Sequence, residues 1–269
     1  MIFNYLVALI GSLLAGIEDL KTTEISDEIP TLMVAFGLFY WFIFSLQKGF
    51  LAPVFNSVLT GLILLVFGWL FYRTGQWGGG DAKLLSAFGF LFPYTIKSGS
   101  MPFIITFTLN LFLVGAIYMV VYIALLGLKN QDIIRDFLKR IKKNKKLFFI
   151  PIGVWLVSYT VLDWAGFATI SYTLSCVFFF TSLIIILFWL YAKSVESVEF
   201  VKRIPVSELK EGDVLYNSKK WDGITKEELR RIKKSKKFVK IKEGVRFGAS
   251  FFLTLVVTYY YGFVLQLII

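Results

Sequence analysis

The chain has no histidine and a single cysteine, Cys176, among its 269 residues. These absences exclude a disulfide scaffold, cysteine-based zinc sites and histidine-dependent catalysis, including Ser-His-Asp and Cys-His arrangements. Acidic residues are also few, because 18 Asp and Glu stand against 29 Lys and Arg. Any chemistry must therefore use carboxylates, Lys, Ser, Thr or Tyr, in a chain whose net charge is +11.

Apolar residues are abundant. They make up 57% of the chain and give a mean hydropathy of +0.71, whereas soluble domains are about 45–50% apolar. A membrane-spanning helix needs about 20 mostly apolar residues. Such spans are expected at 1–18, 29–46, 54–72, 102–127, 148–163, 167–192 and 247–269, and a shorter apolar helix is expected over 82–96. The sequence therefore predicts an all-α polytopic membrane protein with about six to eight transmembrane helices.

Two hydrophilic blocks interrupt the apolar segments. The first is a basic helical connector, and the second is a small α+β domain before the last helix. In this domain "VEFVKRIP" and "GDVLY" are predicted as strands, and a helix is predicted at "TKEELRRIKK", where Thr225 and Glu228 have capping-box spacing. The predicted domains are a membrane core (1–127), the connector (128–147), a transmembrane hairpin (148–192), the small domain (193–246) and a last transmembrane helix (247–269).

The distribution of basic residues predicts the orientation. If both basic blocks are cytoplasmic, working backwards through the spans gives eight crossings with both termini outside. Of the 29 Lys and Arg, only Lys48 and Lys97 then fall outside, as the positive-inside rule requires. The topology accounts for the positive charge, so the lipid bilayer is the expected partner and nucleic acid is not. No pattern in the sequence indicates an oligomeric state.

Two aspartates are expected at the same face of this membrane protein. Asp19 follows the first span, and Asp81 begins the short helix within "GQWGGGDAKLL". Ionisable residues at the membrane boundary are costly and are often functional or paired. Taken singly, each aspartate also has an interpretation without a catalytic role. Asp19 could belong to a solvated loop, since "EDLKTTEISDE" holds five acidic residues. Asp81 could be a helix N-terminal residue that is stabilised by the helix dipole.

A pair of facing carboxylates suits peptide hydrolysis. Such a pair shares a proton, so one carboxylate can take a proton from water while the other polarises the carbonyl and protonates the leaving amine. We expect Gly78 and Gly80 to adopt backbone conformations closed to other residues and to let a substrate strand approach closely. Lys83 either keeps the carboxylate of Asp81 ionised or extends to the membrane interface.

These residues resemble a known family. "Gly78-Gly79-Gly80-Asp81" followed by "Ala82-Lys83" looks like the GxGD-x-K signature of type IV prepilin peptidases, and "Asp19-Leu20-Lys21" fits the position of their first catalytic Asp. The absence of the cysteine-type zinc domain of the bacterial enzymes favours the archaeal prepilin and preflagellin peptidases. The block "ELKEGDVLYN" resembles the small cytoplasmic domain of that branch.

The resemblance implies an aspartic endopeptidase with Asp19 and Asp81 as catalytic residues, supported by Gly78, Gly80 and Lys83. Its partner would be a membrane-inserted pilin or archaellin precursor, cut at the cytoplasmic membrane face after a short basic class III signal peptide. It implies no cofactor and no metal. Nearby acids could attract the basic residues of the substrate or could be ordinary loop acids; they are Glu18, Asp27 and Glu28.

Two other classes of function fit parts of the sequence. A transporter or channel could use Asp19 and Asp81 to bind a cation or relay protons, although no inverted repeat is found and both acids lie at one face rather than at the midplane. A membrane assembly platform could use residues 193–246 to bind acidic partners or lipid headgroups.

Overall fold

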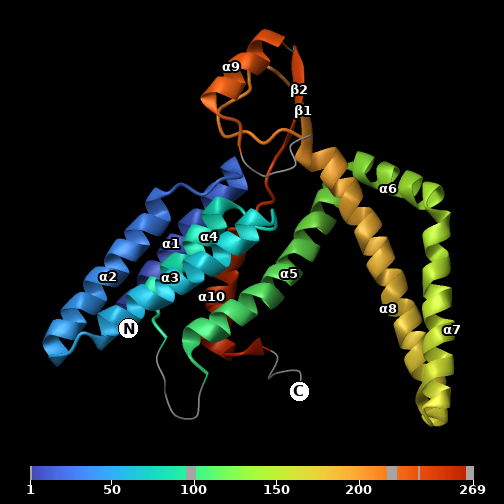
Figure 1. The fold of residues 1–269 in the computed structure, drawn as a ribbon, viewed down its shortest axis with the longest axis horizontal. Helices are drawn as coiled ribbons and strands as arrows, with labels where there is room; N and C mark the ends of the chain where they lie inside the picture. The colour runs from blue at the N-terminus through green and yellow to red at the C-terminus, as the bar shows by residue number, and fades with distance from the viewer. Residues whose placement is uncertain (1, 95–100, 217–222, 236, 265–269) are drawn as a thin grey trace. The chain divides into compact units, whose positions relative to one another are not determined.

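The computed structural model is mostly helical and describes residues 2–94, 101–216, 223–235 and 237–264 (Figure 1). Its first helices are α1 (Ile2–Thr22), α2 (Glu28–Lys48), α3 (Ala52–Arg73), α4 (Gly79–Leu91) and α5 (Phe103–Lys129). They are followed by α6 (Gln131–Lys143), the 3-10 turn η1 (Lys145–Phe148), α7 (Phe149–Trp164), α8 (Ala168–Val195) and the π-helical turn η2 (Glu196–Phe200). The last elements are β1 (Val201–Pro205), α9 (Lys226–Ser235), β2 (Phe238–Lys242) and α10 (Ala249–Tyr261).

The prediction of a polytopic membrane protein is confirmed. Within the described residues, six helical segments are long and apolar enough to cross a membrane. They correspond to α1, α2, α3, α5, η1 with α7, and α8 with η2. By contrast, α4 and α10 have 13 residues each, which is about 20 Å of helix against a hydrocarbon core of about 30 Å.

A short connection joins α2 to α3. Gly49 ends α2 with a φ of 75°, a left-handed conformation that suits glycine, and its N–H donates to the carbonyl of Leu46. Only residues 49–51 separate α2 from α3, and proline occupies the first turn of α3, where its missing N–H costs nothing.

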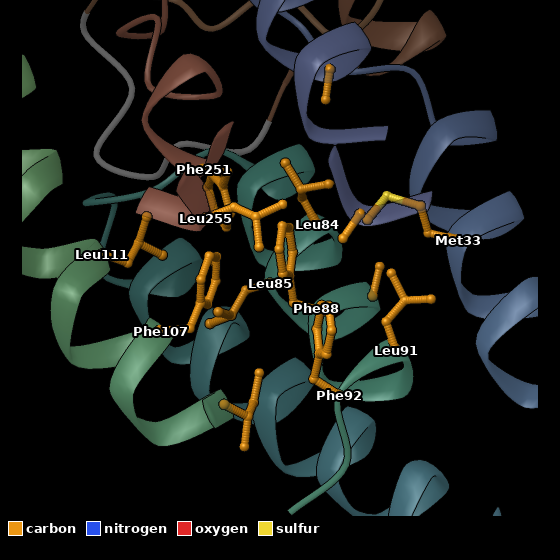
Figure 2. Packing of buried hydrophobic residues seen from close by; sticks show 14 residues of the cluster. Met33, Leu84, Leu85, Phe88, Leu91, Phe92, Phe107, Leu111, Phe251 and Leu255 are labelled. Carbon is orange, nitrogen blue, oxygen red and sulfur yellow. The ribbon is translucent and has the colours of Figure 1, made fainter. Parts of the chain in front are cut away.

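The chain divides into two compact units, residues 1–121 with 205–269 and residues 122–204. In the first unit α4 is enclosed by other helices, and ten of its 13 residues are buried. Phe88 of α4 stacks on Phe107 of α5 with ring centroids 4.2 Å apart. Figure 2 shows these rings beside Phe251 and Leu255 of α10, all part of one apolar core. The predicted short helix thus begins three residues earlier than expected and ends at Leu91.

Glycine allows α3 and α4 to pack backbone against backbone. A Cβ atom on Gly89 would lie 2.9 Å from the Cα of Gly61, and one on Gly68 would lie 2.8 Å from the Cα of Ala82. These contacts pair the start of α4 with the end of α3, so the two helices run antiparallel. Any larger side chain would force them apart.

The small domain has less strand than the sequence suggested. The predicted strand "VEFVKRIP" begins with the π-helical turn η2, and β1 covers only its last five residues. "GDVLY" forms a single antiparallel bridge, between Leu215 and Ile241 of β2. The predicted helix is confirmed as α9, and its capping box is present, because Thr225 N–H donates to Glu228 and Glu228 N–H donates to Thr225 Oγ1.

The second unit contains the predicted basic helix and hairpin. α6 falls within the segment predicted as the connector, and Asp136 pairs with Arg140 four residues later. α7 and α8 form the hairpin, joined through Gly166, whose φ is 85°. The hydroxyl of Tyr191 donates to the carbonyl of Ile123 and ties α8 to the end of α5. The boundaries of the five predicted domains stay a prediction.

Candidate active site

Asp19 lies in the last turn of α1 and is buried, with 4% of its surface exposed. Its Oδ2 accepts a hydrogen bond of 2.7 Å from the backbone N–H of Gly248, which directly precedes α10. Arg246 also interacts electrostatically with this carboxylate. Two groups from the start of α10 therefore act on Asp19.

Asp81 is the third residue of α4 and is 6% exposed. Its Oδ2 accepts a hydrogen bond of 3.1 Å from the N–H of Gly78, so the side chain caps the start of its own helix. Its Oδ1 is buried and has no hydrogen-bond partner among the described residues. Asp81 therefore keeps one oxygen available for a reacting group.

The two aspartates line the same cavity and interact electrostatically. The cavity has a volume of about 650 Å³ and lies within the first unit. It extends from the two carboxylates to β2 and the segment that joins β2 to α10. Residues that are 62 positions apart in the sequence are thus brought to one site, where a water molecule and a peptide group have room.

An aromatic wall forms one side of the cavity. Trp77 stands at its centre, with ring centroids 5.1 Å from Phe71, 5.9 Å from Phe112 and 5.9 Å from Phe247. All four rings line the cavity. This wall was not predicted from the sequence. Its one signal there was the position of Trp77, directly before the three glycines.

Gly78 and Gly80 line the cavity, but their expected backbone conformation is wrong. Gly78 has a φ of −73°, and neither glycine is among the residues with positive φ. Space requires them instead. A Cβ on Gly80 would lie 2.8 Å from the Cβ of Ile25, and a Cβ on Gly78 would lie 3.1 Å from Oδ2 of Asp81.

Lys83 contacts Asp27 rather than Asp81. Its Nζ lies 2.5 Å from Oδ1 of Asp27, and both side chains are largely exposed. The contact links the start of α4 to the loop before α2. A role of Lys83 in catalysis stays a prediction.

The three acids predicted to bind substrate lie outside the described lining of the cavity. Glu18 accepts hydrogen bonds from the N–H and the hydroxyl of Ser26 and so holds the loop between α1 and α2. Asp27 pairs with Lys83, and Glu28 is exposed in the first turn of α2. Their role in binding stays a prediction. Three other acids do line the cavity, namely Glu24, Asp213 and Glu243.

Over the described residues, no three His, Cys, Asp or Glu side chains gather in a way that could hold a metal ion.

Comparison with known proteins identifies the first part of the chain. Residues 6–120, which include both Asp19 and Asp81, match the type IV leader peptidase family. A preflagellin peptidase of Methanococcus voltae is 32% identical over 134 residues, which are 47% of this chain and 57% of that protein. A preflagellin peptidase of Methanocaldococcus jannaschii is 37% identical over 90 residues, which are 34% of this chain and 38% of that protein.

The chain thus spans about half the length of the curated relatives it matches, or less. The resemblance seen in the sequence is confirmed, and none of these findings supports the transporter alternative. Residues 6–120 of this multi-pass membrane protein, which hold both aspartates, are thus similar to the type IV leader peptidase family.

Proposed function

We propose that this protein is a membrane-embedded aspartic endopeptidase that removes the basic signal peptide from an archaellin or pilin precursor. One observation carries the proposal: Asp19 of α1 and Asp81 of α4 are buried in the wall of one cavity. Two carboxylates that interact in a cavity form an acid–base pair. The relatives named preflagellin peptidases support an archaellin precursor as the first substrate to test.

The reaction needs only the two carboxylates and water. The ionised carboxylate takes a proton from water as the water oxygen attacks the carbonyl carbon of the scissile peptide. The protonated carboxylate donates a hydrogen bond to the carbonyl oxygen as charge develops there. As the C–N bond then breaks, the carboxyl pair donates a proton to the leaving amine. The products are a carboxyl group and an amine, and the pair again shares one proton.

The acids that line the cavity suit a basic substrate. Besides the two catalytic aspartates, the lining holds three acids, Glu24, Asp213 and Glu243, and one basic residue, Lys242. The chain as a whole, by contrast, carries an excess of 11 positive charges. The aromatic wall offers an apolar surface on another side. We propose that the basic segment before the scissile bond lies against these acids and that the apolar residues after it lie against the aromatic rings.

We also propose that the site faces the cytoplasm. This orientation follows from the excess of Lys and Arg in the segments predicted to be cytoplasmic. The scissile bond of a precursor with a short basic segment before an apolar helix would lie at that boundary.

The proposal is tested by co-expressing the protein with an archaellin precursor and measuring the conversion to the shorter mature form. Asp19→Asn and Asp81→Asn should each lower the cleavage rate at least about a hundredfold, because each removes one member of the acid–base pair. Asp163→Asn, the same change at an exposed aspartate of α7, should cleave normally. Full processing by either active-site variant would refute the proposal. Ion flux in liposomes without any processing would instead indicate a transporter.

A further inference from the structure

The start of α10 contacts Asp19 directly. The backbone N–H of Gly248 donates to Asp19 Oδ2 over 2.7 Å in a buried position, and the two residues are 229 positions apart in the sequence. No role of Gly248 was evident from the sequence. Because a hydrogen bond from a backbone N–H to a carboxylate is directional and charge-assisted, it fixes the orientation of the carboxyl group.

Space around Gly248 is as restrictive as the hydrogen bond. A Cβ there would lie 3.0 Å from the Cβ of Asp19, 3.1 Å from its Oδ2 and 3.1 Å from Cδ1 of Ile25. The backbone of Gly248, with φ of −54° and ψ of −34°, is open to any residue. Glycine is therefore required for its lack of a side chain, since a methyl group would press on the carboxyl group.

Ile25 joins the two halves of the site. Its Cδ1 faces Gly248, while its Cβ faces Gly80, one residue before Asp81. The same side chain thus packs against the start of α4, which carries Asp81, and against Gly248, whose N–H binds Asp19.

We propose that Gly248 is a positioning residue of the peptidase: its N–H and its missing side chain hold the carboxyl group of Asp19 in the orientation that the reaction needs. The inference rests on the proposed function. A glycine that served only to begin α10 would tolerate serine or asparagine, because these residues cap a helix at least as well as glycine does.

Two substitutions separate the hydrogen bond from the space. Gly248→Ala adds a methyl group and keeps the N–H, whereas Gly248→Pro removes the N–H as well. The φ of −54° suits proline, and proline is accepted at a helix start. Both changes should lower kcat by about tenfold to a hundredfold, because small displacements of a catalytic group cost rates of this order. KM for a purified archaellin precursor should stay unchanged.

Ile25→Val supplies the rescue. It removes Cδ1, one of the three atoms that a Cβ on Gly248 would meet. In the double variant with Gly248→Ala, the methyl group can move toward the vacated space, and much of kcat should return. In the double variant with Gly248→Pro the N–H is still missing, so kcat should stay low. Gly153→Ala, whose added Cβ would meet nothing within 4 Å, is the control.

The outcomes are distinct when the unfolding temperature of each variant in detergent is measured alongside. A wild-type kcat for Gly248→Ala or Gly248→Pro overturns the inference, and so does rescue of both double variants or of neither. If the proline variant does not fold, the alanine variant and its rescue decide alone. The variants Asp19→Asn and Asp81→Asn in the same series test the proposed function. If they are inactive while Gly248→Pro cleaves normally, only the role of Gly248 is lost.

Discussion

At the scale of single residues, the two oxygens of Asp81 have different surroundings. Oδ2 caps α4 through Gly78, whereas Oδ1 is buried without a hydrogen-bond partner among the described residues. An unsatisfied buried acceptor costs about 1–3 kcal/mol, and such a cost is typical of atoms that act on a ligand. We therefore expect Oδ1 to be the oxygen that meets the attacking water or the scissile carbonyl.

The neighbouring glycines 79 and 80 should respond oppositely to alanine. A Cβ on Gly79 would make ordinary contacts with Tyr72, at 3.7 Å and beyond, whereas one on Gly80 would lie 2.8 Å from the Cβ of Ile25. Both are helical, so the helix propensity of alanine should keep Gly79→Ala at least as stable as the wild type, by up to about 1 kcal/mol. Gly80→Ala should lose about 1–3 kcal/mol through overpacking.

Thermal unfolding in detergent measures both variants. Ile25→Val removes Cδ1 but keeps Cβ, so it should not restore Gly80→Ala. Equal unfolding temperatures for the two alanine variants would contradict the proposed contact with Ile25.

The acids of the cavity should affect substrate binding more than the reaction rate. The triple variant Glu24→Gln, Asp213→Asn, Glu243→Gln should raise KM for an archaellin precursor by about threefold or more, since each partly exposed charge pair contributes about 0.2–1 kcal/mol. Salt should weaken the effect. A precursor with glutamine in place of its basic residues should not distinguish the triple variant from the wild type.

Glu208→Gln is the matched control for these acids, because Glu208 is exposed, lies outside the described lining and has no predicted role in binding. If Glu208→Gln raised KM as much as the triple variant, a general effect of surface charge would explain the result. An unchanged KM in the triple variant would remove the assigned role of these acids.

The sequence could predict those parts of the site that leave a local pattern, but not contacts between residues far apart in the chain. Asp19 and Asp81 were identified because each stands at the end of an apolar segment, and the structure places both in one cavity. Gly248 could not be paired with Asp19, because a contact over 229 residues leaves no local pattern. Its one signal was a glycine at the start of the last predicted span, at the face expected for both aspartates.

At the scale of elements, α4 ends inside the protein, and side chains of other helices donate hydrogen bonds to its last carbonyl groups. The carbonyl of Leu91 accepts from Asn4 Nδ2 and Trp41 Nε1, and the carbonyl of Phe90 accepts from Ser57 Oγ. The last carbonyls of a helix have no partner within it, and an apolar surrounding offers them no water. The cap supplied by α1, α2 and α3 explains how a helix of 13 residues can end there.

Loss of one of these caps should destabilise the protein. Ser57→Ala leaves the carbonyl of Phe90 without its donor, because the N–H of Tyr94 donates to Thr60 instead. The expected loss is about 1–3 kcal/mol, seen as a lower unfolding temperature in detergent. Ser12→Ala is the matched control, since Ser12 is equally buried but donates to a carbonyl of its own helix, that of Ala8. Equal losses would argue against the cap.

The long helices were predictable, and the strands only in part. Runs of about 20 apolar residues define α1, α2, α3, α5 and α8 to within a few residues, because the membrane sets their length. β1 lies within a predicted strand, whereas β2 was not predicted, although its buried Val239 and Ile241 alternate with lysines. Five residues are too few for such an alternation to stand out, and the π-helical turn η2 was missed inside the predicted strand.

At the scale of the whole molecule, the side of the membrane on which each loop lies depends on α4. Between Gln47 at the end of α2 and Lys142 in α6 lie α3, α4 and α5. If α4 and the residues after it return the chain across the membrane, these two positions face opposite sides. If they do not, the two positions face the same side. The predicted arrangement of eight crossings, with both basic blocks in the cytoplasm, requires the first outcome.

Cysteine labelling tests this topology in a background of Cys176→Ser, which removes the single native thiol. Gln47→Cys, Lys142→Cys and Glu227→Cys all place a thiol at an exposed position. A membrane-impermeant maleimide added to intact cells should label Gln47→Cys alone, and the other two should react after the membrane is opened. Cleavage of the archaellin precursor by each variant provides the check on folding. Labelling of both Gln47→Cys and Lys142→Cys from outside would show that α4 is not part of a crossing, because the two positions would then face the same side. It would also place the basic connector on the side opposite to the predicted one.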